Sequence, residues 1–363
     1  MAIESKNSSL AKARDAKQDE FYTQLSDIEK ELKHYKKYFK GKVVYCNCDD
    51  PRVSGFFHYF SYNFEKLGLK KLIATCYKSE ERDLFSTNNS DAAIMLEYTG
   101  DKDNNNVPDS SEIGIVKLKG DGDFRSEESI ELLKQADIVV TNPPFSLFRE
   151  YVRQLIDYDK KFIIVGSKNA ITYKEIFNLI KDNKLWLGNG FAAGNAYFKI
   201  PPENARNYAN GVYDKTTGLV KFRNVGWFTN LDISKRHEEL ILYRDFSSDA
   251  YPHYDNYDAI EVDKVKDIPK NYDGVMGVPI TFLEKHNPDQ FEILGVTQSW
   301  CDGRIKTYPK QVQVGANGAE SFVTKLNDGA AIAVEVPPSN QTYYIVDGIN
   351  YVKVYARVLI KRK

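Results

Sequence analysis

The sequence predicts an α/β fold for the larger part of the chain and a smaller region of mixed or β-rich character after it. Short β-branched runs alternate with amphipathic helical segments from Lys42 to Ile180. After about Phe222, short aromatic and β-branched runs separated by Gly, Pro and Asp replace this alternation. With 363 residues, the chain also exceeds a typical single domain, so we expect one large domain and one smaller one.

The expected division follows this change of pattern. Residues 1–40 form an N-terminal arm and a helix, 41–225 the α/β domain, and 226–363 the smaller region. The first 18 residues carry four Lys or Arg against two acidic residues, which suits either an arm that lies on phosphates or a frayed terminus. A helical pattern follows at 26–40.

Strands and helices alternate through the larger domain. Its expected strands are 43–46, 71–77, 115–118, 137–140 and 162–165, and its helices are 56–67, 127–135, 148–156 and 173–180. Residues 79–112 read as an Asn-, Asp- and Ser-rich insertion with one strand at 93–98. The alternation predicts a parallel sheet covered on both faces, which binds ligands at the carboxyl ends of its strands. Strands expected in the smaller region are 227–231, 291–297, 331–336, 343–346 and 351–360.

Composition excludes several classes of protein. The net charge of −1 gives no overall electrostatic case for nucleic acid, so any such site depends on local patches. No segment approaches the roughly 18–20 apolar residues that span a bilayer, and the N-terminus lacks a signal-peptide core. We therefore expect a cytoplasmic protein with no membrane partner. Cys46, Cys48, Cys76 and Cys301 lack the spacing of a disulfide framework or a zinc site, and we expect buried thiols.

The most informative segment is the run Asp-Ile-Val-Val-Thr-Asn-Pro-Pro-Phe at 137–145. Its apolar part has the length and β-branched content of a buried strand. Pro143 and Pro144 then end the strand and fix the turn, since proline locks φ and has no N–H. The Asn142 side-chain oxygen and the Pro143 carbonyl offer two acceptors, and Phe145 offers a flat apolar face.

This arrangement suits an exocyclic amino group on a planar ring. Its two N–H bonds would meet the two acceptors while the ring packs on the aromatic face. The alternative is an ordinary loop, because Pro-Pro pairs are common and this chain has two others, at 201–202 and 337–338. Neither of those follows Asn or precedes an aromatic residue, which favours the functional interpretation.

Three further segments lie where a nucleoside cofactor would need them. Asp49, Asp50 and Pro51 follow the strand at 43–46, Asp123 and Phe124 follow the strand at 115–118, and Phe21, Tyr22 and Thr23 precede the first helix. Each also has a plainer interpretation. Asp-Asp-Pro is often a helix-entry turn and Phe-Tyr is often core. Gly120 to Asp123 is similar to the start of a calcium loop but lacks the remaining ligand positions.

Together these segments resemble the S-adenosylmethionine-dependent amino-methyltransferases, and specifically the EcoRI-type adenine-specific (N6-adenine) DNA methyltransferase family. The likeness covers about residues 15–285 and is carried by segments 19–24, 43–54, 120–126, 139–151, 171–175 and 274–283. It implies a Rossmann-like catalytic domain, followed by a target-recognition region. It also implies methyl transfer from S-adenosylmethionine to a flipped-out adenine in double-stranded DNA, with a cognate restriction endonuclease as partner and with no metal.

The resemblance also implies roles for the residues named above. Asn142, Pro143, Pro144 and Phe145 would hold the adenine, and Phe21, Tyr22 and Thr23 would line the methionine end of the cofactor. Asp49, Asp50 and Pro51 stand at the first cofactor motif, and Asp123 and Phe124 would contact the cofactor's adenine. The first motif lacks Gly-x-Gly, and no acidic residue ends the second strand at Tyr77. The choice between Asp49 and Asp50, and the ribose ligand, therefore stay open.

Two other kinds of function remain open at this point. An amino-methyltransferase acting on RNA adenine or on a protein glutamine would use the same chemistry on another substrate. A non-catalytic DNA-binding regulator would use the same scaffold without the reaction, although the intact turn at 142–145 disfavours it.

Overall fold

The computed structural model describes residues 22–48, 54–75, 93–105, 107–109, 111–191, 194–200 and 211–363. The chain has a mixed α/β fold with several sheets and divides into two compact units. The first unit comprises Met1–Ile180 and Lys184–Ile233, and the second Lys181–Asn183 and Ser234–Lys363. No helix among the described residues is both long and apolar enough to cross a membrane.

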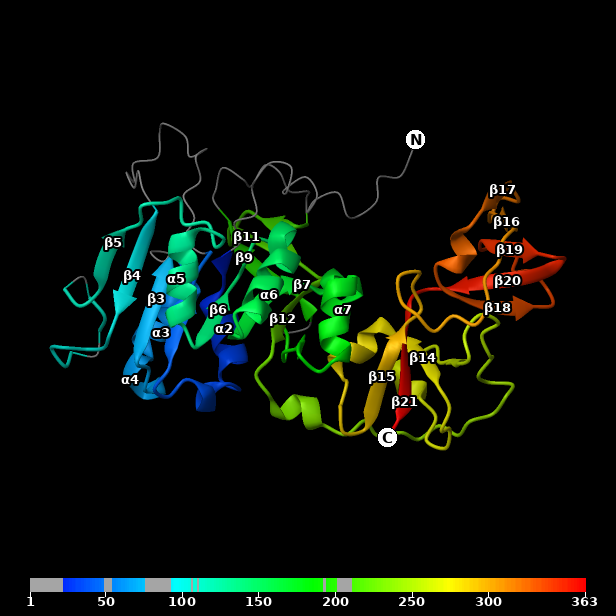
Figure 1. The fold of residues 1–363 in the computed structure, drawn as a ribbon, viewed down its shortest axis with the longest axis horizontal. Coiled ribbons are helices and arrows are strands. Elements are labelled where there is room, and N and C mark those ends of the chain that lie inside the picture. The colour runs from blue at the N-terminus through cyan, green and yellow to red at the C-terminus, as the bar shows by residue number, and fades with distance from the viewer. Residues whose placement is uncertain are drawn as a thin grey trace. The chain divides into compact units, whose positions relative to one another are not determined.

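The first unit is built on a sheet of eight strands in the order β5-β4-β3-β2-β6-β7-β12-β8 (Figure 1). The strands are β2 Val43–Cys46, β3 Lys71–Thr75, β4 Ile94–Tyr98, β5 Gly114–Lys117, β6 Ile138–Thr141, β7 Lys161–Ser167, β8 Trp186–Leu187 and β12 Val225–Thr229. Strands β3, β2, β6 and β7 run parallel, as predicted. Every residue of β2 and β6 is buried, which explains why both read as continuous apolar runs.

The other strands of this sheet correct the prediction of a parallel sheet. Strand β4 is antiparallel to β3, and β5 is antiparallel to β4, so the segment expected as a third parallel strand is an exposed edge strand. The strand expected at 227–231 in the smaller region lies instead in the large sheet. As β12 it is antiparallel to both β7 and β8, and it is buried throughout. The continuous burial of β12 is typical of a strand in a sheet that is covered on both faces.

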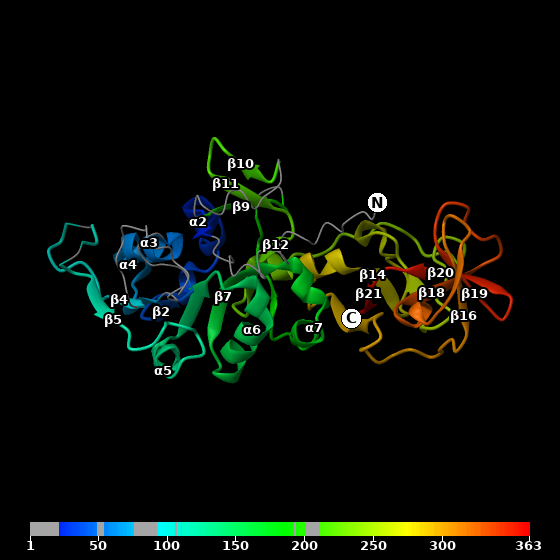
Figure 2. The same cartoon turned by 90° about the horizontal axis from the view of Figure 1, so that it is seen from above.

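Helices cover both faces of the large sheet, as Figure 2 shows for α3 and α4 on one face and α5 and α6 on the other. The helices are α2 Leu25–Leu32, α3 Gly55–Tyr62, α4 Phe64–Leu67, α5 Glu127–Gln135, α6 Phe148–Asp157 and α7 Lys174–Lys181. The helix expected at 56–67 is therefore two helices. They divide at Asn63, whose side-chain amide donates to the Tyr59 carbonyl over 2.8 Å.

The helix expected at 26–40 ends at Leu32 and is followed by a 3-10 turn, η1 Lys36–Tyr38. The buried Glu31 lies in the last turn of α2. Its carboxylate accepts from the Tyr35 hydroxyl at 2.9 Å and from the backbone N–H groups of Asn189 and Gly190 at 2.9 and 3.0 Å. A buried carboxylate needs such donors, and these tie α2 to the segment after β8.

A smaller sheet of the first unit has the order β1-β9-β11-β10. Its strands are β1 Tyr22–Thr23, β9 Ala196–Lys199, β10 Tyr213–Asp214 and β11 Leu219–Phe222. The described residues of the first unit also form the 3-10 turns η2 Phe145–Leu147 and η3 Lys168–Thr172. The main hydrophobic core cluster includes residues of α2, β2, α3, β9, β11 and β12, so both sheets contribute to one core.

The second unit is β-rich, and between Ser234 and Lys363 its helical turns are all of the 3-10 type. Two sheets have the orders β13-β14-β21-β15 and β17-β16-β19-β20-β18. The strands are β13 Ile260–Glu261, β14 Met276–Pro279, β15 Phe291–Val296, β16 Gln311–Val314, β17 Glu320–Val323, β18 Ala330–Val334, β19 Tyr343–Val346, β20 Ile349–Val354 and β21 Arg357–Arg362. The turns are η6 Ser234–His237, η7 Val265–Asp267, η8 Ile280–Glu284 and η9 Lys325–Asn327.

The single strand expected at 351–360 is thus wrong. The run divides between β20 and β21, which belong to different sheets.

Gly166 in β7 allows α6 to pack directly on the sheet. A Cβ at this position would lie closer than 3.0 Å to three ring carbons of Phe148, the buried first residue of α6. We expect Gly166→Ala to destabilise the first unit by about 1–3 kcal/mol, because the ring must leave its place in a filled core. Chemical denaturation would measure the loss. Gly226→Ala, where the new Cβ would meet only the flexible side chain of Lys168, is the matched control.

Candidate active site

The Asn-Pro-Pro-Phe turn follows the buried end of β6. Thr141 pairs with Ile164 in the last register position between β6 and β7, and the chain then leaves the sheet. Asn142 and Pro143 are buried, whereas Phe145 is half-buried. The Pro144 carbonyl accepts from the Leu147 N–H at 3.0 Å and so closes the turn that leads into α6. The turn is therefore held at both ends, by the sheet and by the helix.

Asn47, at the end of β2, fastens this turn to the neighbouring strand. The Thr141 hydroxyl donates to the Asn47 carbonyl, and the Tyr151 hydroxyl donates to the Asn47 side-chain oxygen. All three residues are buried. Burial raises the pKa of Tyr151 well above its ordinary value, so this hydroxyl stays a neutral donor. The ends of β2 and β6 are thereby joined through side chains.

The segment Tyr22–Thr23 lies close to the aromatic face of the turn. In the pairing of β1 with β9, Thr23 is opposite Phe198. The Phe198 ring lies edge-on to the Phe145 ring, with 6.4 Å between the ring centroids. Phe198 is thus both the strand partner of Thr23 and a ring neighbour of Phe145. Sequence analysis had assigned Thr23 to the cofactor and Phe145 to the target base.

Thr23 also provides a structural test of whether a polar cofactor fits here. Its hydroxyl oxygen is buried, and no described residue forms a hydrogen bond with it. A Cβ on Gly55 would lie 2.8 Å from the Thr23 carbonyl, so the first turn of α3 is packed against this segment. Ser54 caps that turn by accepting from the Phe56 N–H. A buried hydroxyl without a partner beside a helix N-terminus suits a polar, anionic group such as an amino-acid carboxylate.

Phe124, which follows Asp123 in the chain, contacts the ring of Tyr151. The Phe124 ring is buried edge-on to Tyr151, with 5.0 Å between the ring centroids. Asp123 is held by Arg125, whose Nε and Nη2 donate to its two oxygens at 2.8 and 2.6 Å. Hydrogen bonding by Arg125 lowers the pKa of Asp123, which stays ionised. The Oδ1 atom also accepts from the Arg125 backbone N–H at 2.8 Å, whereas the Oδ2 atom keeps a second lone pair that can accept from a ligand.

Phe21, Asp49, Asp50 and Pro51 lie outside the described residues, so the structure leaves their predicted roles untested. Cys48, which directly precedes Asp49, has φ 79°, a left-handed conformation that favours glycine. The chain therefore turns sharply after β2 although the sequence has no Gly-x-Gly there. Of the described cysteines, Cys46 is buried, whereas Cys48 and Cys301 are partly exposed, so the expectation of buried thiols is correct for Cys46 alone.

Sequence analysis missed Asn47, Tyr151 and Phe198. Asn47 directly follows a predicted strand and so carried a signal equivalent to that of Asn142. Tyr151 lies within a segment that carried the family likeness, but a tyrosine on a helix face is ordinary. Phe198 had no local signal, because its importance comes from pairing with a strand at the other end of the unit.

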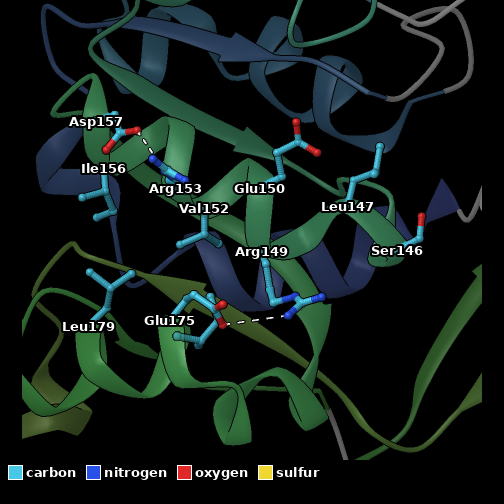
Figure 3. A pocket seen from close by; sticks show the side chains of 11 residues that line it. Ser146, Leu147, Arg149, Glu150, Val152, Arg153, Ile156, Asp157, Glu175 and Leu179 are labelled. Atoms are coloured by element: carbon cyan, nitrogen blue, oxygen red, sulfur yellow. Dashed lines mark ion pairs between the residues drawn. The ribbon is translucent and has the colours of Figure 1, made fainter.

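A cavity of about 440 Å³ lies between α6 and α7. Figure 3 shows apolar side chains between the helices, among them Val152 and Leu179, with ion pairs from Arg149 to Glu175 and from Arg153 to Asp157. The cavity is lined at one end by Ser146 and Leu147 and contains none of the predicted site residues. We therefore place the candidate site at the strand ends and not in this cavity.

Comparison with known proteins identifies a family whose members are similar to this chain in sequence. The model of the family described as adenine-specific methyltransferase EcoRI matches residues 9–363. The chain is 53% identical to Type II methyltransferase M.EcoRI of Escherichia coli over 298 residues, which are 81% of this chain and 90% of that protein. It is 40% identical to M.MgeORF184P of Mycoplasma genitalium and 38% identical to M.MpnI of Mycoplasma pneumoniae, in each case over 78% of this chain and 84% of the relative. No solved structure matches.

Proposed function

The chain belongs to the EcoRI family of adenine-specific methyltransferases, and from that premise we propose how its own residues carry out the reaction. It is a DNA adenine methyltransferase of the kind found in restriction–modification systems. Our proposal is that it takes a methyl group from S-adenosylmethionine and places it on the N6 atom of an adenine turned out of the duplex. The connection of Asn47, Thr141 and Tyr151 beneath the Asn-Pro-Pro-Phe turn is the observation that carries it.

S-adenosylmethionine supplies an electrophilic methyl group on a sulfonium. We assign its methionine end to Phe21, Tyr22 and Thr23 together with the first turn of α3, because the buried Thr23 hydroxyl needs a partner there. Asp49, Asp50 and Pro51, which follow β2 in the chain, are assigned to the same cofactor. Asp123 and Phe124 take the cofactor's adenine. The parallel strands at this edge then form a Rossmann-like site, with its ligand at their carboxyl ends.

The target adenine is assigned to Asn142, Pro143, Pro144 and Phe145. Its amino nitrogen is a poor nucleophile because the lone pair is delocalised into the ring. The Asn142 side-chain oxygen and the Pro143 carbonyl accept hydrogen bonds from its two N–H groups and draw the nitrogen towards tetrahedral geometry. Buried acceptors interact more strongly than acceptors in water, and a turn fixed by two prolines keeps them in place.

Phe145 is assigned to stacking on the flipped base. We expect Phe145→Ala to lower kcat/KM for DNA methylation by about 10-fold to 100-fold, because stacking on an aromatic side chain contributes about 1–3 kcal/mol per base. Phe145→Trp should retain most of the rate. Steady-state kinetics on duplex DNA measures the change, and Tyr62→Ala, which removes an exposed aromatic residue of α3, is the control. A normal rate for Phe145→Ala would contradict the stacking role.

We propose that the second unit contains the target-recognition region. It is slightly acidic, so specificity must depend on a few placed polar and basic groups. Several of its cations are held within the unit. Arg304 donates to the carbonyls of Asn327 and Ser299, and Lys306 is paired with Asp255 at 2.7 Å. Lys310, Lys361 and Lys363 are exposed, and these remain as candidates for phosphate contacts.

Methylation assays with labelled S-adenosylmethionine on duplex DNA, RNA and protein test the substrate. We expect label in duplex DNA alone. Transfer only to RNA adenine or to a protein glutamine would replace the proposal with the first alternative, and DNA binding without any transfer would support a regulator. Mapping N6-methyladenine in the DNA of expressing cells then gives the recognised sequence, and a cognate endonuclease would be blocked by that same mark.

A further inference from the structure

Strands β4 and β5 lie at the edge of the large sheet (Figure 1). Three acidic side chains meet in the connection between these strands. One carboxylate oxygen from each of Asp101, Asp103 and Glu112 lies within 4.8 Å of the others. Two oxygens bound to opposite sides of one Ca²⁺ ion are at most about 5 Å apart, because each Ca–O distance is about 2.3–2.6 Å. The spacing thus fits ligands of a single ion.

Glu112 gives a second and independent reason to expect a cation. Its side chain is 4% exposed, which is exceptional for a glutamate. Only one of its oxygens is satisfied, by the Lys102 N–H, and no described residue donates to the buried Oε2 atom. A buried carboxylate oxygen without a partner is costly, and two other carboxylates beside it add repulsion. A bound cation would satisfy the Glu112 Oε2 atom and offset the repulsion among the three carboxylates.

The sequence of this connection has the ligand spacing of a calcium loop. In the twelve-residue EF-hand loop, ligands come from positions 1, 3, 5, 7, 9 and 12, with a backbone carbonyl at 7 and a bidentate Glu at 12. The corresponding residues here are Asp101, Asp103, Asn105, Val107, Asp109 and Glu112. The pattern departs at its sixth position, where Asn106 replaces glycine. Asn is among the residues that adopt the left-handed conformation most readily.

We propose that residues 101–112 bind Ca²⁺ through Asp101, Asp103 and Glu112, with further oxygens from the same loop. The site differs from an EF-hand in its surroundings, since two antiparallel strands flank it in place of two helices. Carboxylate oxygens held by a loop favour Ca²⁺ over Mg²⁺, which needs a smaller and more regular shell. The ion takes no part in methyl transfer. It links the two ends of the loop that connects β4 to β5, and after β5 the chain continues to Asp123 and Phe124.

Calorimetric titration of the purified, EDTA-treated protein with Ca²⁺ tests the site. We expect one ion per chain with a Kd between about 10⁻⁶ and 10⁻³ M, and Mg²⁺ at least about 10-fold weaker. Terbium(III), a Ca²⁺ substitute excited through nearby tyrosine, should emit when bound, since Tyr98 ends β4 just before the loop. Absence of saturable binding up to about 10 mM Ca²⁺, or equal affinity for Mg²⁺, would overturn the proposal.

Variants locate the binding. Glu112→Gln keeps the size of the side chain, and Asp103→Asn changes an exposed one, so both should fold. Each should weaken Ca²⁺ binding by about 10-fold or more, because ligand charge sets the affinity of such loops. Glu131→Gln, an exposed carboxylate of α5, is the matched control and should bind normally. Ca²⁺ should raise the melting temperature of the wild type more than that of either variant. Wild-type affinity in both variants would place the ion elsewhere and refute the site.

Discussion

Replacing Asn142 with alanine is expected to lower methyl transfer by about 100-fold to 1,000-fold, the scale on which enzymes lose rate when one polar group at the reacting centre is removed. The side chain is buried at the end of β6, and in the proposed mechanism it accepts a hydrogen bond from the amino group in the transition state. Because it does not line the methionine end of the cofactor site, the Kd for S-adenosylmethionine should change little. Single-turnover methylation and equilibrium cofactor binding measure the two quantities separately.

A second substitution at the same position separates acceptor chemistry from shape. Asn142→Asp keeps an oxygen that accepts hydrogen bonds and loses the amide donor. It should therefore retain more activity than Asn142→Ala. If the aspartate and alanine variants are equally inactive, the side chain acts through its amide donor. If Asn142→Ala turns over normally, the assigned role is wrong.

Replacing Arg357 with alanine should destabilise the second unit by about 3–5 kcal/mol, the usual cost of removing one partner from a buried ion pair. Arg357 of β21 and Glu261 of β13 are 12% and 10% exposed, and their closest atoms are 2.6 Å apart. Tyr254 also donates to Glu261, so the loss of Arg357 leaves a buried carboxylate with a single side-chain donor. Thermal and chemical unfolding should show an earlier transition.

The control is the ion pair between Lys270 and Asp245, which are 49% and 64% exposed. Lys270→Ala should cost less than about 1 kcal/mol, since water already screens this pair. Changing both Glu261 and Arg357 to Met should cost less than the single Arg357→Ala change, because no uncompensated charge remains. Equal losses in Arg357→Ala and Lys270→Ala would show that burial does not strengthen the first pair.

Local sequence patterns predicted the elements whose form depends on nearby residues. The bounds predicted for β2 and α5 agree with the structure, since a buried apolar run and a Ser-capped amphipathic helix are local signals. The sheet to which a strand belongs is a long-range property. The pattern at 225–229 is that of a buried strand, but it carries no sign that its partners are β7 and β8. The chain also leaves one sheet for the other near the exposed Tyr355 without a Gly or Pro to mark the change.

The same distinction applies to the candidate site. The turn at 142–145 could be predicted because its residues are consecutive. The connection of Asn47 to Thr141 and Tyr151 could not, because it joins residues about a hundred positions apart. Residues 101–112 read as a polar insertion because their composition is that of a loop. Their ligand spacing and the burial of Glu112, neither of which composition reveals, distinguish them from an ordinary loop.

The pairing of β1 with β9 also constrains when the enzyme becomes active during its synthesis. Tyr22 and Thr23 leave the ribosome early, but their partners Lys199 and Phe198 are made much later. Until β9 has emerged, Thr23 has no strand to pair with and Phe145 has no Phe198 ring beside it. The parallel strands β2, β3 and β6 can associate before then. A nascent chain stopped before β9 should therefore hold much of the sheet yet bind no cofactor.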